Sequence, residues 1–286
     1  GDFLFVNKFA YGPKIPQTPL SFPFAHHTLP FSETKKSYLE WIKLPYFRLP
    51  GFGSVKNNDI VVFNYPDGDT VAIGDQNSSY YELTRQLSYL IKRQDLNDGQ
   101  VSKSDDFYYS KAWEYMNNSK NVFPWSNKPI VEIVARPPDK REHYVKRCVG
   151  IAGDKFEVRN SDIYINDVLQ AMPKKAQHYF LVKCSSRVFG EESNSSNGRI
   201  SLTNSALLDK LDIYASEVSV EAISKDTIVY KLNMPADVAE DVKKIPDVIS
   251  VIRNAEQKGY REFTVFPHNN SYAWNNDFFG PLIIPK

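Results

Sequence analysis

The first 66 residues combine short apolar runs with proline-rich chain. Phe3 to Phe9 and Asp59 to Tyr65 are β-branched and aromatic runs, each followed closely by a Pro/Gly turn sequence, which predicts two strands. Residues 13–50, called the arm below, hold seven prolines and should have little regular structure, because proline removes a hydrogen-bond donor and fixes φ. The aromatic residues of the arm must pack on the body of the protein or on a membrane surface, and they are Phe22, Phe24, Phe31, Tyr38, Trp41, Tyr46 and Phe47.

A helical period begins near residue 77. Apolar residues recur at spacings of four and three, which predicts an amphipathic helix over residues 77–93 with Asn77 or Ser78 as its N-cap. The repeating residues are Leu83, Leu87, Leu90 and Ile91. A second, shorter helix is expected from Asp105 to Met116.

Short strand patterns return after residue 129, with a hairpin expected around Asn160. Together with the earlier runs they predict one twisted antiparallel β core. Its expected strands are 3–9, 59–65, 130–135, 144–151, 155–158, 162–165 and 263–266.

Residues 171–262 alternate between strand and helix patterns, which predicts a small α+β subdomain inserted into an otherwise β protein. The expected elements are strands at 179–184, 226–232 and 248–252, helices at 205–211 and 236–244, and a Ser/Asn-rich loop at 191–198. The predicted fold class is therefore mainly β, an antiparallel core with an inserted α+β cap.

Composition supports a folded protein without a nucleic-acid partner. Of the 286 residues, 42% are hydrophobic and 14% aromatic, which is enough for a packed core. The net charge is only +1, whereas nucleic-acid binders usually carry a large basic excess. The longest apolar runs fall far short of the ~20 residues that cross a bilayer, so any membrane anchor would lie outside this sequence.

Cysteine and histidine positions predict neither a metal nor a cofactor. Cys148 and Cys184 could form a disulfide in an oxidising compartment or stay as two reduced thiols. The five histidines are scattered, with His26 and His27 as the sole adjacent pair. Neighbouring side chains on an extended segment point in opposite directions, so we expect these two to be structural rather than joint ligands.

Three segments, in the same order along the chain, resemble the bacterial type I signal peptidases. Residues 1–12 (GDFLFVNKFAYG) resemble the strand after the family's catalytic serine, and residues 58–66 (NDIVVFNYP) resemble its next strand. Residues 144–154 (YVKRCVGIAGD) are similar to the segment that carries the family's lysine base. The His-His arm and long insertions resemble the enlarged enzymes of Bacteroidetes-type bacteria.

The resemblance implies a serine endopeptidase in which Lys146 is the general base, without a metal or cofactor. A lysine accepts a proton only when it is neutral, and burial is what lowers a lysine pKa from about 10.4 toward 7–8. On a strand, Lys146 shares one face with Tyr144 and Cys148, a setting that favours desolvation, whereas a surface lysine is the plain alternative. Tyr144 and Val145 correspond to positions near the substrate pocket, or else pack in the core. Arg147 is expected to pair with a carboxylate.

The implied organisation is a catalytic β core at 1–170 with a helical insertion at about 67–129, a cap at 171–262, and a return to the core at 263–286. The implied setting is the periplasmic side of the inner membrane. Expected partners are secretory preproteins, through their signal peptides, and the membrane surface, with no nucleic acid.

The sequence departs from the family at both ends. It lacks the serine stretch, Ser-x-Met-x-Pro-Thr-Leu, and the late Gly-Asp-Asn-Arg segment. Truncation at both ends, or a natural homologue that lost catalysis and acts as a binding module, would explain both absences. In either case this polypeptide should be inert. A self-cleaving repressor would need a helix-turn-helix and a basic face, and neither is evident. An unrelated β protein is the last alternative.

Overall fold

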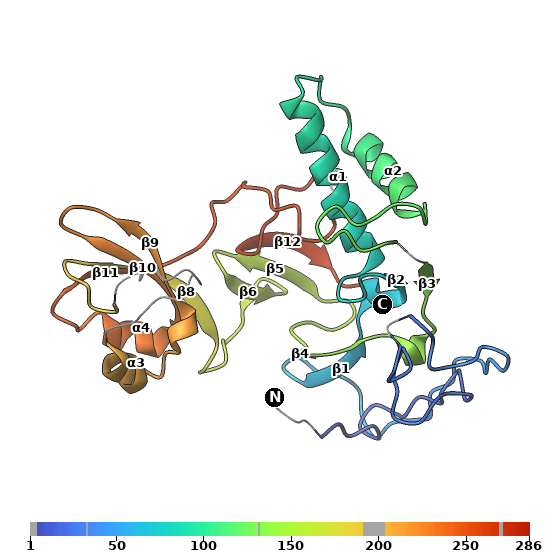
Figure 1. The fold of residues 1–286 in the computed structure, drawn as a ribbon. Coiled ribbons are helices and arrows are strands. Elements are labelled where there is room, and N and C mark those ends of the chain that lie inside the picture. Colours follow the sequence, from blue (N-terminus) through green and yellow to red (C-terminus); the bar gives the residue numbers. More distant parts are fainter. Residues whose placement is uncertain (1–4, 33, 131, 191–203, 269–270) are drawn as a thin grey trace. The chain divides into compact units, whose positions relative to one another are not determined.

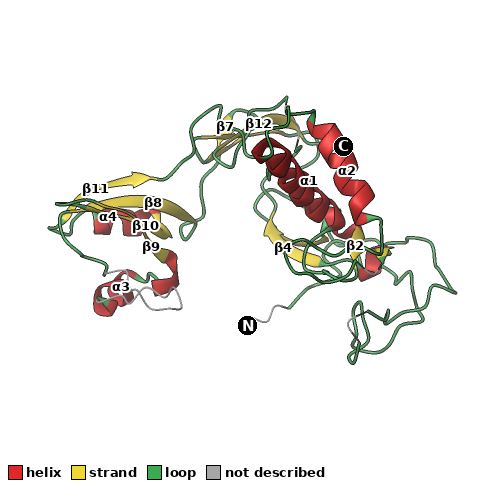
Figure 2. Cartoon of the chain, turned by 45° about the horizontal axis from the view of Figure 1, so that its top comes forward, coloured by secondary structure: helices red, strands yellow, loops and turns green. Residues whose placement is uncertain are grey.

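The computed structural model describes residues 5–32, 34–130, 132–190, 204–268 and 271–286. The chain divides into two compact units, Gly1–Val149 and Gly150–Lys286. In the described ranges the protein is mostly β, with twelve strands in four antiparallel sheets and four α-helices (Figure 2). This agrees with the mainly β fold class expected from the sequence. No helix within these ranges is both long and apolar enough to span a bilayer.

The first unit contains two small two-stranded sheets (Figure 1). Strand β1 (Ile60–Asn64) pairs with β4 (His143–Arg147), and β2 (Thr70–Ala72) pairs with β3 (Ile133–Ala135). Two short 3-10 helices, η1 (Pro66–Asp69) and η2 (Pro138–Lys140), begin at prolines, as the turn sequences predict. The β1–β4 ribbon is the element that positions the candidate site.

A pair of helices packs beside β2 in the first unit (Figure 1). Helix α1 (Tyr80–Asn97) and helix α2 (Asp105–Met116) confirm both predicted helices. Ser79, rather than Asn77 or Ser78, is the N-cap of α1, because its hydroxyl accepts a hydrogen bond from the Glu82 amide at 3.1 Å. The buried residues of this core are Ala72, Tyr80, Leu83, Leu87, Ala112, Met116, Phe123 and Ile130.

The second unit begins with a four-stranded sheet in the order β12-β5-β6-β7. Its bounds are β5 (Lys155–Arg159), β6 (Asp162–Ile165), β7 (Val168–Leu169) and β12 (Phe278–Ile283). The predicted hairpin is confirmed, since Asn160 and Ser161 both have positive φ in the tight turn between β5 and β6. Gly280 also has positive φ, and a Cβ there would lie 2.8 Å from the Phe156 carbonyl oxygen, so this bulge of β12 requires glycine.

The other sheet of this unit has the order β11-β8-β10-β9, with two short helices packed on it. The bounds are β8 (Gln177–Cys184), α3 (Ser205–Leu211), η3 (Ala215–Glu217), β9 (Val218–Ile223), β10 (Ile228–Pro235), α4 (Ala236–Val242) and β11 (Val248–Arg253). Alternate residues of β10 are buried, the period of two expected for a strand with one face on a core. These elements match the α+β pattern predicted for residues 171–262, while the domain boundaries themselves stay predictions.

Three strand predictions are wrong. Residues 5–9 form no strand, and residues 3 and 4 of that prediction lie outside the described ranges, as does the loop predicted at 191–198. Residues 263–266 form turns, and the strand that pairs with β5 is β12 instead. The strands expected in one core sheet are divided among three sheets. Strand β1 pairs with β4, β3 pairs with β2, and β5 and β6 belong to the sheet that contains β12 and β7.

The arm has little regular structure, as predicted, and polar contacts tie it to η2. Thr18 donates from its amide and its hydroxyl to Asp139 Oδ2, at 3.1 and 2.8 Å, and Lys140 Nζ donates to the Ser21 hydroxyl at 2.9 Å. Tyr38 is buried beneath the Lys140 ammonium. Packing on the body was one of two expectations for the arm's aromatic residues, and it holds for Tyr38 alone. The exposed ones are Phe22, Phe24, Phe31, Trp41, Tyr46 and Phe47.

Candidate active site

Lys146 lies in β4, directly opposite Val61 of β1. Residues that face each other across an antiparallel pair share one side of the sheet, so Lys146 shares a face with Val61 and with the Tyr144–Phe63 pair. The strand occupies His143–Arg147, shorter than the predicted 144–151, because its pairing with β1 ends at Arg147 and the chain turns at Ala152 and Gly153.

Tyr144 and Val145, the two predicted substrate-binding residues, directly precede the lysine in sequence and lie on opposite faces of the ribbon. The Tyr144 ring lies 4.7 Å, centroid to centroid, from the ring of Tyr65. Tyr144 is 38% exposed and Val145 is 39% exposed, so neither residue belongs to a closed core. Both are therefore accessible to a ligand on the ribbon surface.

The Lys146 side chain is exposed, whereas its strand position in the sequence favoured desolvation. The reason is that β1 and β4 form a ribbon of only two strands, with no third strand or helix packed on the lysine's face among the described residues. No carboxylate of the described ranges forms an ion pair with it. Desolvation of this lysine would have to come from chain or substrate that covers the ribbon.

The prediction that Arg147 pairs with a carboxylate is wrong, because it forms no ion pair within the described residues. Its guanidinium instead donates to the backbone carbonyl of Asn58 at 2.9 Å. The same end of the ribbon is closed by two backbone hydrogen bonds of Cys148, to Asn58 and Asp59. Arg147 therefore links the segment before β1 to the end of β4 through this hydrogen bond.

The glycines and the aspartate after β4 have a local structural role. Gly153 has positive φ, and a Cβ on Gly150 would lie 2.6 Å from the Ile284 Cδ1. Asp154 accepts from the Ile151 amide at 3.0 Å and from Asn166 at 2.9 Å, which closes the turn. The Gly-x-x-Gly-Asp pattern is thus what this turn needs, whatever the chemistry nearby.

Comparison with known families finds a match over part of the chain. Residues 120–201 match the family model described as signal peptidase, peptidase S26. This segment is therefore similar to the signal peptidases. Searches of curated proteins and of solved structures found no match.

The signal peptidase match spans β4 and therefore contains Tyr144, Val145 and Lys146. The other two resembling segments, residues 1–12 and 58–66, lie outside the matched range. The family that this segment matches consists of serine peptidases. The roles of the three site residues stay predictions.

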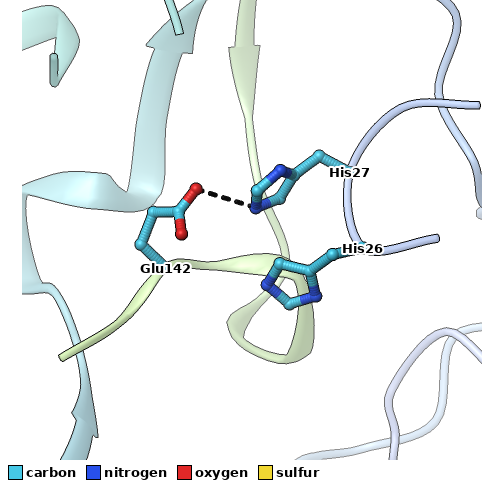
Figure 3. A group of neighbouring side chains, drawn as sticks. All are labelled: His26, His27 and Glu142. Carbon is cyan, nitrogen blue, oxygen red and sulfur yellow. Dashed lines mark ion pairs between the residues drawn. The ribbon is translucent and has the colours of Figure 1, made fainter. Parts of the chain in front are cut away.

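The sequence reasoning missed one group of side chains, His26, His27 and Glu142 (Figure 3). The two histidine rings do not point in opposite directions. Their centroids are 4.2 Å apart, because the chain bends at both residues instead of running extended. Burial, followed by the charge of Arg136, lowers the pKa of His27 to about 4, so its contact with Glu142 joins a neutral imidazole to a carboxylate. The adjacent histidines were the signal, but their bend was not visible in the sequence.

Proposed function

We propose that this chain is the extracytoplasmic part of a signal peptidase I that hydrolyses the peptide bond releasing secretory signal peptides. The observation that carries the proposal is the family match over the segment with Lys146 in its Lys-Arg-x-Val-Gly-x-x-Gly-Asp context. Neutral Lys146 takes the proton of a serine hydroxyl as that oxygen attacks the scissile carbonyl carbon. The protonated lysine then gives that proton to the leaving amine as the peptide C–N bond breaks, which leaves an acyl-enzyme and a neutral lysine. The lysine next takes a proton from water, whose oxygen attacks the ester carbonyl, and returns the proton to the serine oxygen as the acyl group leaves.

The proposal requires two things that the 286 residues do not contain. One is the serine stretch, which the family places shortly before a Gly-Asp like that of residues 1 and 2. The other is cover for Lys146, because withdrawal from water is what favours the neutral form of a lysine that acts as a base. A serine-bearing segment and the bound signal peptide, lying over Tyr144 and Val145, would supply both.

A membrane surface fits the same proposal. The exposed aromatic residues of the arm, among them Trp41 at 83% and Phe31 at 98% exposed, are of the kind that enters the interfacial region of a bilayer. A peptidase whose substrates are held in the membrane by signal peptides needs such an orientation. We place this surface on the periplasmic side of the inner membrane.

The second candidate function is a non-catalytic homologue that binds signal peptides, and the exposure of Lys146 is the observation in its favour. The test is cleavage of a preprotein by the complete gene product, its Lys146→Ala variant, and Lys183→Ala as a control lysine on the exposed side of β8. We expect full activity in the control, none in Lys146→Ala, and none in residues 1–286 alone. Near-normal cleavage by Lys146→Ala would contradict the lysine's role, and inactivity of the complete protein would favour the binding module.

A further inference from the structure

His26, His27 and Glu142 bring three metal-ligand atoms together, two imidazole nitrogens and a carboxylate oxygen, all within 4.8 Å of one another (Figure 3). The histidines belong to the arm, and Glu142 immediately precedes β4. All three lie in the first compact unit. Residues more than a hundred positions apart thus meet at one point.

Hydrogen bonds of the backbone hold this geometry in place. Phe24 has positive φ, which turns the chain just before the histidines. The His27 carbonyl accepts from the Ser37 amide at 2.9 Å, which ties the bend to the returning limb of the arm. On the other side, the Glu142 carbonyl accepts from the Tyr65 amide at 2.9 Å. The backbone that carries each ligand is therefore anchored, and no large rearrangement is needed to bring the ligands together.

One nitrogen of the group lacks the partner that a buried polar atom requires. Nε2 of His27 is buried and makes no hydrogen bond within the described residues, although it lies 2.9 Å from Oε1 of Glu142. An unsatisfied buried donor or acceptor destabilises the fold, so native structures rarely keep one without a reason. A cation between the nitrogen and the carboxylate would satisfy both.

His26 adds a feature common among metal-binding histidines. Its Nε2 lies 3.2 Å from the backbone carbonyl oxygen of Arg141, which can hold one tautomer of the ring. A ligating imidazole usually makes such a contact with the nitrogen that does not bind the metal, or rotates to release it. His143 stacks at 5.5 Å from His26, but its own Nε2 faces the side-chain amide of Asn64.

We propose that His26, His27 and Glu142 form a binding site for a divalent transition-metal ion of the zinc class. Two imidazoles and one carboxylate are a donor set that suits zinc and its neighbours rather than magnesium or calcium, which prefer oxygen alone. With bonds of about 2.0–2.1 Å, tetrahedral ligand atoms lie roughly 3.4 Å apart. One ligand pair, His27 Nε2 and Glu142 Oε1, is 2.9 Å apart, and all three atoms lie within 4.8 Å of one another. Small side-chain rotations therefore suffice, and solvent fills the fourth position.

Positive charges nearby set the affinity. The Arg136 guanidinium lies 3.7 Å from Glu142 Oε1, and Lys140 also acts on His27. These cations repel a metal ion, but Glu142 has two oxygens and can face Arg136 and the metal at once. We expect a moderate site, with a dissociation constant in the micromolar range, rather than a tight structural zinc centre.

The bound ion would fasten the arm to the residue that leads into β4, the strand of Lys146. The inference goes beyond the proposed peptidase function and does not depend on it, because metal binding is measured without any turnover. Failure of one proposal therefore leaves the other standing.

Calorimetric titration of the tag-free chain with Zn²⁺ at pH 7 tests the site. We expect one ion per chain, and a loss of affinity of at least about tenfold in each of His26→Ala, His27→Asn and Glu142→Gln, since even outer-sphere partners cost this much. His268→Ala, a histidine of the other unit, is the matched control and should bind as the parent does. Circular dichroism checks that each variant is folded.

Co²⁺ binding to the unaltered protein gives a second measurement that needs no variant. The inference predicts the visible absorption of tetrahedral cobalt, lost on addition of Zn²⁺. Absence of saturable Zn²⁺ binding, binding that His268→Ala abolishes, or binding that survives both His27→Asn and Glu142→Gln would overturn the site.

Discussion

The Tyr11 hydroxyl donates a hydrogen bond to Oδ2 of Asp59 across 2.7 Å, joining the chain before the arm to the residue that precedes β1. The same carboxylate oxygen accepts from the Lys56 amide at 2.9 Å, while the Asp59 carbonyl accepts from the Cys148 amide at 2.8 Å. Asp59 thus links the N-terminal segment, the loop before β1 and the end of β4. The bond from Tyr11, followed by that from Lys56, holds the pKa of Asp59 below its usual value.

Tyr11→Phe should raise the pKa of Asp59 toward its ordinary value, because the variant removes the largest stabilisation of the ionised form. The pKa of Asp59 is lower in the folded protein than in the unfolded chain. The hydrogen bond therefore stabilises the fold at pH values above the unfolded-state pKa, and this stabilisation is lost as the pH falls through the folded-state pKa. A carbon-13 NMR titration of the carboxyl group measures the shift. An unchanged Asp59 titration would contradict the assignment, and Tyr46→Phe, an exposed tyrosine of the arm, is the control.

Ser79→Ala should lower the free energy of unfolding by about 1 kcal/mol, the usual cost of losing an N-cap. The Ser79 hydroxyl satisfies the Glu82 amide at the start of α1, and alanine leaves that amide without its partner. Denaturant unfolding followed by circular dichroism measures the loss. Ser78→Ala is the matched control with little expected effect; if Ser78→Ala cost more than Ser79→Ala, the cap would be the residue that the sequence suggested.

Cys184 should react with thiol reagents far more slowly than Cys148 in the folded protein. Neither cysteine forms a disulfide within the described residues, but Cys184 is fully buried in the sheet core, and burial raises its pKa to about 11. At pH 8 about one Cys184 in a thousand would be a thiolate, the reactive form. Mass spectrometry after timed iodoacetamide labelling, with Cys148→Ser as the control, gives the two rates. Equal rates in the folded state would contradict the burial of Cys184.

The exposed aromatic residues of the arm should bind anionic bilayers. Replacing Phe24, Phe31 and Trp41 together by serine should weaken vesicle binding by more than about tenfold, because fully burying one such side chain is worth about 1.5–3 kcal/mol. Co-sedimentation with phosphatidylethanolamine/phosphatidylglycerol vesicles measures the partition.

Ile252→Ser is the control for this experiment, since Ile252 is 62% exposed on β11 and lies outside the arm. Binding that is lost equally in Ile252→Ser, or retained in the triple variant, would remove the arm as the membrane-contacting surface.

Local elements were predictable because their causes are local. The spacing of Leu83 and Leu87 places both on the buried face of α1, and the short polar turn at Asn160 brings β5 and β6 together. The segment of Lys146 was recognisable for the same reason, since a strand and its following turn leave a compact sequence pattern. Even so, the cap of α1 was expected one or two residues too early, at Asn77 or Ser78 rather than Ser79, because several neighbouring polar side chains fit that position.

The sequence by itself determined the mainly β character, the helices α1 and α2, and the likeness of residues 144–154 to the signal peptidase lysine segment. Only the tertiary structure decided that Lys146 is exposed on a two-stranded ribbon and that β12, not residues 263–266, pairs with β5. It also brought His26 and His27 to Glu142 through a bend of the arm. Burial, strand pairing and ligand geometry depend on contacts between residues far apart in the chain, and no local pattern of polar and apolar residues specifies which of these contacts form.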